Sequence, residues 1–154
     1  MTAPFPPTIA EAAAGLAAGD LTAAGLTELC LARIEALDGL VNAYHKVLKD
    51  EALASAAASD ARRAAGKDVG PLDGIPLAVK DVIQVENHAC TANSRVLQDN
   101  IADTDAGVIA RLRAAGAVIL GIVDTYEFAF GGRPTHDALF PPACNPWDLT
   151  RSTG

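Results

Sequence analysis

Lys80 is the residue of this chain whose type and position could carry out chemistry. It ends a short apolar run, residues 75–79, that follows a turn signal at Asp73-Gly74. The length of the run and its internal proline favour a buried strand over a helix. A buried ammonium is costly unless it reaches water, pairs with a carboxylate such as Asp81, or loses its proton and becomes a base. On the strand pattern alone, reaching water or pairing is the commoner outcome.

Cysteine and histidine give little support for other chemistry. These residues are Cys30, Cys90, Cys144, His45, His88 and His136. The cysteines have neither CxxC spacing nor a histidine at ligand spacing, so neither a zinc site nor a disulfide framework is indicated. We expect each histidine to be a surface or loop residue. No GxGxxG or GxxxxGK[ST] motif is present, which weakens any case for nucleotide binding.

The composition is that of a globular protein. The chain has 154 residues, of which half are hydrophobic and a fifth are charged, enough for one domain with a real core. Twelve basic and nineteen acidic residues give a net charge of −7 without a basic patch, so nucleic acid is not an expected direct partner. The sequence begins without a signal-peptide pattern and has no run of membrane-spanning length, so we expect a cytoplasmic protein without membrane contact.

Two helices are expected at the start of the chain. Thr8 and Glu11 form a capping box for the first, which ends at Gly19-Asp20. The second begins near Thr22 and is expected to stop at Asp38-Gly39. Together they predict a helical layer over residues 1–38.

The middle of the chain predicts strands alternating with helices. Residues 41–48 are expected to form a strand, and the alanine-rich residues 50–65 an exposed connecting helix whose alanines reflect helix propensity and close packing rather than a binding surface. Thr104-Asp105 is expected to cap a helix that ends at Gly116, and the all-apolar residues 117–123 to form a strand covered on both faces. About forty residues separate the two buried strands, which leaves room for a helical crossover between parallel neighbours. The fold class is therefore α/β.

The last thirty or so residues contain an aromatic segment before Gly131-Gly132 and a turn with the single tryptophan. By composition alone, the aromatic residues of these two segments are expected to be core. They are Tyr126, Phe128, Phe130 and Trp147.

Four segments, in order and spacing, resemble the amino-terminal part of the amidase signature family. This family of Ser-cisSer-Lys amide hydrolases includes the A subunit of the tRNA-dependent amidotransferases. The segments are GIPLAVKD at 74–81, LRAAGAVILG at 112–121, EFA at 127–129 and NPWDLTR at 145–151. The resemblance covers essentially the whole chain and implies a mixed β-sheet covered by helices on both faces. Residues 1–154 would form an incomplete amino-terminal segment of one domain, with residues 70–154 as the lysine-bearing catalytic segment.

The resemblance assigns the family's catalytic lysine to Lys80. In such a triad a neutral, desolvated lysine accepts a proton that a bridging serine relays from the nucleophilic serine. Attack on an amide carbonyl would give an acyl-enzyme stabilised by backbone N–H groups, and water would then release the acid after ammonia or an amine has left. No metal or organic cofactor is required.

The chain departs from the family pattern at its end. The relatives' Gly- and Ser-rich stretch, with the bridging serine, would begin where Gly154 ends the chain, and Ser152 comes too early to be that serine. We therefore expect these residues to supply only the lysine of the triad. Alone they are expected to be inactive and to fold poorly, because the sheet would lack strands.

Smaller differences bear on the substrate. Asp124 replaces an asparagine of many relatives, and Asn87 and Asn93 lie where relatives often have glycine. Phe130, Gly131 and Gly132 align with a segment that lines the acyl pocket in relatives, although a core role for Phe130 fits equally well. Glu127 could simply be a structural carboxylate near the site.

Two functional classes and one non-enzyme class remain open. The first is a stand-alone hydrolase of a small amide, carbamate or urea-type compound. The second is an amidotransferase subunit that feeds ammonia to a partner, and it would use Lys80 in the same way. The third is a catalytically incomplete scaffold, which the retained Lys80 disfavours. The expected protein partners are a second copy of the chain or the remaining part of the amidase chain.

Overall fold

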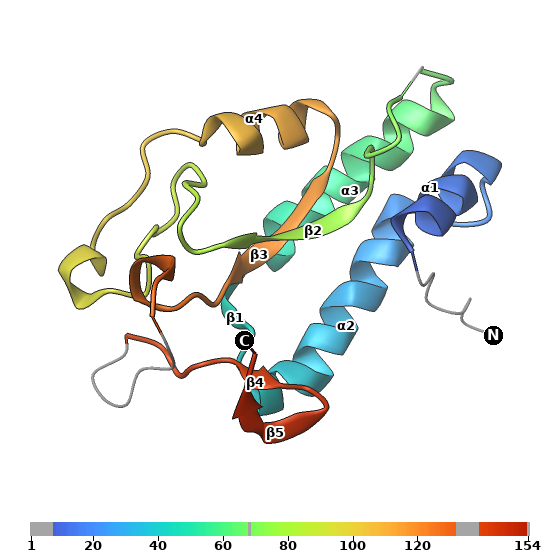
Figure 1. The fold of residues 1–154 in the computed structure, drawn as a ribbon. Coiled ribbons are helices and arrows are strands. Elements are labelled where there is room, and N and C mark those ends of the chain that lie inside the picture. The colour runs from blue at the N-terminus through green and yellow to red at the C-terminus, as the bar shows by residue number, and fades with distance from the viewer. Residues whose placement is uncertain (1–7, 68, 132–138, 154) are drawn as a thin grey trace.

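A three-stranded sheet forms the centre of the fold. The computed structural model describes residues 8–67, 69–131 and 139–153. The helices are α1 (Ile9–Ala18), α2 (Ala23–Val41), α3 (Lys49–Ala64) and α4 (Gly107–Ala114). The strands are β1 (Tyr44–Val47), β2 (Pro76–Lys80), β3 (Val118–Val123), β4 (Cys144–Asn145) and β5 (Asp148–Ser152). The central sheet has the order β1-β3-β2, and β4 and β5 form a separate hairpin (Figure 1).

The central sheet is mixed. β2 runs parallel to β3, and β1 runs antiparallel to β3 on its other side. The predicted parallel pairing of the two apolar runs is therefore confirmed, and α4 lies in the crossover between them. Side chains of a strand alternate between its two faces. Val118 and Leu120 of β3 enter one hydrophobic cluster and Ile119 enters another, so helices cover both faces of the sheet as predicted.

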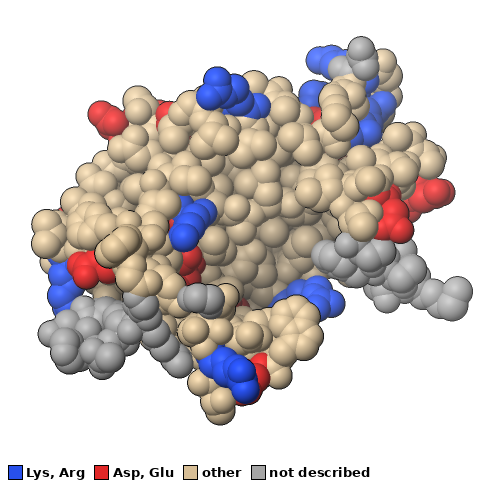
Figure 2. Space-filling view, viewed as in Figure 1, with Lys and Arg blue, Asp and Glu red and all other residues tan. Residues whose placement is uncertain are grey.

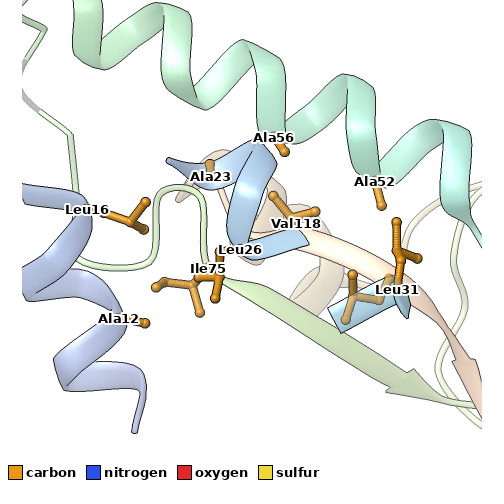
Figure 3. Close-up of a cluster of buried hydrophobic side chains, with 10 residues drawn as sticks. Ala12, Leu16, Ala23, Leu26, Leu31, Ala52, Ala56, Ile75 and Val118 are labelled. Carbon is orange, nitrogen blue, oxygen red and sulfur yellow. The ribbon is translucent and has the colours of Figure 1, made fainter. Parts of the chain in front are cut away.

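The larger cluster joins α1, α2 and α3 to one face of the sheet (Figure 3). Ala52 and Ala56 of α3 are fully buried in it. Alanine brings little apolar area, but its small side chain lets a helix approach its neighbours closely. The close packing expected of these alanines is therefore confirmed, but the helix is not simply an exposed connection, because the alanine face of α3 packs on α2 and β3.

The second cluster lies on the opposite face, under α4. Its buried members are Leu48, Val79, Val85, Ile109 and Ile119. It fixes β2 through Val79, the residue immediately before Lys80. The backbone that presents Lys80 therefore belongs to the core of the molecule.

The helix ends agree only partly with the sequence signals. The capping box of α1 is confirmed, since the Glu11 N–H donates to Thr8 Oγ1 at 3.1 Å. Helix α2 begins after Thr22 as predicted, but it continues through Asp38-Gly39 to Val41. Its end is set by Asn42 in the left-handed conformation, with φ at 50°. Asp38 does not break the helix, because its carboxylate accepts the Ala43 N–H at 2.8 Å just beyond the helix end.

This extension leaves a shorter strand than the predicted 41–48. The predicted cap of α4 is also wrong, because the N-cap position is Ala106 and no side chain caps it. Asp105 instead accepts the Glu86 N–H at 2.8 Å and pairs with Arg113 at 2.8 Å. Gly116, with φ at 81°, follows the end of α4 as expected.

Surface charge is dispersed on the face shown in Figure 2. Lys and Arg side chains lie singly or in small groups among uncharged residues there, and no basic patch covers that face. No helix in the described parts of the chain is both long enough and apolar enough to span a bilayer.

Gly121 allows β1 to lie against β3. A Cβ at this position would lie 2.3 Å from the Lys46 carbonyl oxygen and 3.1 Å from Val47 Cα. These are backbone atoms and cannot move without separating the strands. We predict that Gly121→Ala lowers the free energy of unfolding by about 1–3 kcal/mol, measured by urea denaturation.

Gly39→Ala is the matched control. Gly39 lies inside α2, and no atom lies within 4 Å of the place that a Cβ would occupy there. Alanine favours helix, so this variant should be as stable as the parent or more stable by up to about 1 kcal/mol. Equal effects of the two substitutions would show that close strand approach at Gly121 is not limiting.

Candidate functional site

Lys80 lies at the carboxyl end of β2, beside the end of β3. Its register partner is Val123, the last residue of β3. Lys80 is exposed and lines a cavity of about 250 Å³ together with residues that include Asp124, Ala143 and Thr153. Within the described residues, the Lys80 ammonium can therefore reach water. The proton relay through two serines that the resemblance implies requires a desolvated lysine, and these residues do not provide that desolvation.

Asp81 is not the partner of Lys80. Its side chain is 1% exposed, and Oδ1 accepts the Thr91 N–H at 2.8 Å. The Thr91 hydroxyl also donates to Oδ2 of the same carboxylate. Asp81 therefore fastens the loop after β2 to the strand end that carries Lys80.

His45 lies between two carboxylates. Its Nδ1 is 3.1 Å from Asp81 Oδ2, and its Nε2 is 2.9 Å from Asp124 Oδ1. The side chain of His45 is 4% exposed and that of Asp124 is 10% exposed. The expectation that His45 is a surface or loop residue is therefore wrong.

The local backbone explains how His45 reaches this position. The β1–β3 register shifts between Tyr44 and Lys46, so β1 has one extra residue at His45. Such a bulge redirects a side chain relative to a regular strand. A weak signal was present in the sequence, because Asp81 and Asp124 each directly follow an apolar strand and two buried carboxylates need a cationic partner.

The two carboxylates and the imidazole shift one another's protonation. Burial lowers the pKa of His45, but the hydrogen bonds to Asp124 and Asp81 outweigh burial and raise that pKa above its ordinary value. Burial likewise raises the pKa of Asp81, but hydrogen bonds from His45 and Thr91 outweigh it and lower that pKa. Both shifts favour the charged forms.

His88 lies in the loop after β2, as the expectation of a surface or loop residue allows, but it is buried. It is 7% exposed, with Nε2 at 3.1 Å from Glu51 Oε2 and Nδ1 at 3.4 Å from Lys46 Nζ. Its contacts therefore differ from those of His45, since one nitrogen faces a cation. His136 lies outside the described residues.

Asp124 and Asn93, which we expected from the resemblance to depart from the family pattern, meet at this site. Asn93 Nδ2 donates to the Thr125 carbonyl at 2.9 Å and lies 3.4 Å from Asp124 Oδ1. Asn93 Oδ1 accepts the Phe140 N–H at 3.2 Å, and Asp124 Oδ2 accepts the Ala143 N–H at 2.8 Å. Together the two side chains hold the segment that leads into β4 against the end of β3.

Glu127 serves a structural role in the same region. Its Oε1 accepts a hydrogen bond from the Ser94 hydroxyl at 2.7 Å, and Ser94 is 1% exposed. The contact joins the loop after β2 to the short helical turn Glu127–Ala129.

The aromatic residues near the site are not core residues of the described chain. Phe128, Phe130 and Trp147 are 57%, 88% and 92% exposed, so the expectation from composition is wrong for these three. Trp147 lies in the turn between β4 and β5, as the turn signal predicted. Gly131 has φ at 93°, and Gly132 lies outside the described residues. The assignment of Phe130, Gly131 and Gly132 to substrate binding stays a prediction.

Other parts of the described chain offer weaker site chemistry. A hollow of about 470 Å³ at the start of α2 is lined mainly by apolar side chains such as Leu21, Leu26 and Leu29, away from Lys80. Among residues 8–67, 69–131 and 139–153, no cluster of His, Cys, Asp and Glu has the arrangement of a metal site.

The comparison with protein families decides what this arrangement belongs to. Residues 25–154 match the family model described as Amidase. The chain belongs to the amidase family. Lys80, both apolar strands and the β4–β5 hairpin all lie within the matched residues of this amidase chain.

Curated relatives cover nearly all of the amidase chain. It is 48% identical to the A subunit of glutamyl-tRNA(Gln) amidotransferase from Chloroflexus aurantiacus over 96% of its length and 30% of that protein. It is 46% identical to the protein of the same name from Streptomyces coelicolor, over 96% of its length and 29% of that protein. The chain thus spans about 30% of the length of these relatives.

Solved structures share the fold. One, described as an unexpected vestigial protein complex that reveals the evolutionary origins of an s-triazine catabolic enzyme, superposes with a TM-score of 0.85 at 39% identity. That superposition covers 92% of the amidase chain and 31% of the solved chain. Native peptide amidase from Stenotrophomonas maltophilia superposes with a TM-score of 0.74 at 40% identity, over 81% and 26% of the two chains.

The His45 contacts predict how stability depends on pH. Because its folded pKa is raised, His45 contributes stability that is fully present below its ordinary pKa of about 6.5 and lost as pH rises through the raised value. We predict that the stability difference between the parent and His45→Gln, measured by thermal melting, shrinks from about pH 6 to about pH 9.

Asp81 gives the opposite dependence at low pH. Its lowered folded pKa means that its contribution is present above about pH 3.9 and is lost as pH falls through the lowered value.

His88→Gln is the control for the His45→Gln melting experiment, because the His88 ring faces both a cation and a carboxylate. A His45→Gln difference that stays constant with pH would contradict a charged His45.

Proposed function

We propose that the protein containing this chain hydrolyses amide bonds and that Lys80 is its catalytic base. The observation that carries the proposal is the position of Lys80, at the carboxyl end of a parallel strand and facing a cavity, inside the residues that match the amidase family. Side chains at strand ends are the usual source of chemistry in α/β folds.

In the proposed reaction Lys80 enters as a neutral amine. It accepts a proton that a bridging serine relays from a nucleophilic serine, whose oxygen attacks the amide carbonyl. Collapse of the tetrahedral intermediate breaks the C–N bond and releases ammonia or an amine after proton return from the lysine. Water then cleaves the ester and releases the acid. Both serines and the oxyanion-hole N–H groups would come from the part of the family domain that these residues do not span.

The proposed substrate is a small amide, carbamate or urea-type compound, with the C–N bond outside a peptide. The exposed Phe130 and the adjoining Gly131 and Gly132 would line the acyl pocket. An aromatic side chain that is 88% exposed in the described chain is free to contact a ligand or a further segment. The similarity to a structure associated with an s-triazine catabolic enzyme supports a nitrogen-rich substrate class.

A second candidate is an amidotransferase A-type subunit in a multi-subunit complex. It is favoured by the two curated relatives, both named as subunits of such an enzyme, at 48% and 46% identity. Copurification of further subunits with the tagged native protein would favour this candidate, whereas a homodimer that hydrolyses small amides would favour the first. A scaffold without activity is the third candidate. The cytoplasmic location stays a prediction.

Removal of the lysine amine tests the proposed role of Lys80. The intact mass of the native protein should exceed the 15.8 kDa of these residues, and a fluorophosphonate should label it on a serine. We predict that Lys80→Ala lowers the labelling rate about a thousandfold or more, because the serine loses its base.

Lys46→Ala is the matched control, since Lys46 lies on β1, on the other side of β3 from the strand of Lys80, and is also exposed. It should label at the parental rate. Parental labelling of a folded Lys80→Ala protein would reject the role of Lys80. A native mass equal to 15.8 kDa without labelling would favour the scaffold.

The pocket assignment makes a separate prediction. Phe130→Ala should lower kcat/KM by about tenfold for substrates with an apolar acyl group and leave the free energy of unfolding unchanged. Phe128→Ala, a change at a partly exposed aromatic residue of the same segment, is the comparison. A loss of stability without any change in substrate preference would instead assign Phe130 to the core of the complete protein.

A further inference from the structure

His45 faces a carboxylate with each of its ring nitrogens. Nδ1 lies 3.1 Å from Asp81 Oδ2 and Nε2 lies 2.9 Å from Asp124 Oδ1. An ionised carboxylate can only accept a hydrogen bond, and a neutral imidazole has a single N–H. Both contacts are hydrogen bonds at once only if the ring carries two N–H groups and a positive charge.

Asp81, Asp124 and His45 come from three strands, at the edge of the sheet where β2 ends with Lys80. Asp81 follows Lys80 directly, Asp124 follows β3, and His45 occupies the bulge of β1. The cavity at Lys80 is lined by Asp124 and by Ala43, which precedes β1. The two His45 contacts join Asp81 to Asp124. They therefore fix the end of β2, which carries Lys80, relative to the side of the cavity that Asp124 lines.

Further contacts join these residues to the segment before β4. Asp124 Oδ2 accepts the Ala143 N–H at 2.8 Å, and Ala143 also lines the cavity. The Phe140 ring stacks on the His45 ring, with centroids 3.9 Å apart and an interplanar angle of 20°. A cation stacked on an aromatic face is stabilised further.

The charge balance also favours a cation. Within the described part of the chain, Asp81 and Asp124 are the charged groups that face His45, and both are nearly buried. With a neutral ring the two carboxylates would carry two negative charges close to the end of β2, and one of them would face the lone pair of the unprotonated ring nitrogen. With an imidazolium, His45 and the two carboxylates carry a net charge of −1, and an N–H group of the ring faces each carboxylate.

We propose that His45 is a positioning residue which, as an imidazolium donating to both Asp81 and Asp124, clamps the strand end that carries Lys80 to the cavity wall formed after β3. The clamp does not require the reaction proposed above. Its effect on catalysis does rest on that reaction, so the test has one arm that is independent of activity.

The first arm measures the charge of the ring by nitrogen NMR of the complete native protein labelled with ¹⁵N-histidine. At about pH 7.5, one unit above the ordinary pKa, both nitrogens of His45 should have imidazolium shifts. His88 is the internal comparison, because Lys46 faces its Nδ1 and should keep that nitrogen an acceptor. Loss of the signal in His45→Gln assigns it.

Asp124→Asn changes one partner without changing its size. The amide oxygen can accept from Nε2, but the second negative charge is gone, so the His45 signal should shift toward a neutral ring at the same pH. An imidazolium in the parent that this substitution leaves unchanged would overturn the proposed clamp. A neutral ring in the parent would overturn it as well.

The second arm uses amide hydrolysis against pH. His45→Gln should lower kcat/KM by about tenfold at neutral pH, and the double variant His45→Gln/Asp124→Asn should recover part of that loss because the unpaired charge is removed. Additive losses would mean that His45 acts only by packing. If no variant or parent hydrolyses amides, the proposed function fails, and the NMR arm still decides the clamp.

Discussion

The burial of β3 on both faces is the constraint from which the rest of the arrangement follows. A strand covered on both faces must find its hydrogen bonds within the sheet, so β3 lies between β2 and β1. Because β2 is parallel to β3, both strands end at the same edge, and Lys80 pairs with Val123 there. Asp81 and Asp124 directly follow these two strands. The pairing of the strands brings the two side chains together, and the residues between them in the sequence do not.

At that edge of the sheet, the buried carboxylates carry negative charge that is costly to bury without a cationic partner. Two carboxylates that are 1% and 10% exposed lie next to the Lys80 strand end. The compensating group comes from β1, which reaches the edge because Gly121 lets its backbone approach β3. Gly121 thus permits the close packing of β1 on β3, and the bulge of β1 places His45. Packing and electrostatics at this site are consequences of the same strand pairing.

Local signals in the sequence predicted local structure. The Thr8–Glu11 capping box, the start of α2 after Thr22 and the two apolar strands depend on neighbouring residues, and each was predictable. Which alanines of α3 are buried was not, because alanine has the same helix propensity at Ala52 and Ala56 on the packed face as on an exposed face. The two aspartates after the strands were a weak signal for a cationic partner, but they did not indicate His45, since a bulge and a contact across 79 residues bring it to Asp124. The exposure of Phe130 depends on the residues that lie around it in the fold, and amino-acid composition does not predict these neighbours.

Asp124 and His45 are best understood as one unit of the site. An asparagine, which the family resemblance leads us to expect at this position, could accept one hydrogen bond from a neutral imidazole, and its amide would carry no charge to balance. An aspartate at the same position adds a charge that is 10% exposed, and a nearby cation offsets the cost of burying it. Lys80 could provide that cation, but a lysine held by a carboxylate is a poor base because the pairing stabilises its protonated form. In the proposed clamp, the imidazolium of His45 would allow Asp124 to be buried and would leave Lys80 available for the proposed proton transfer.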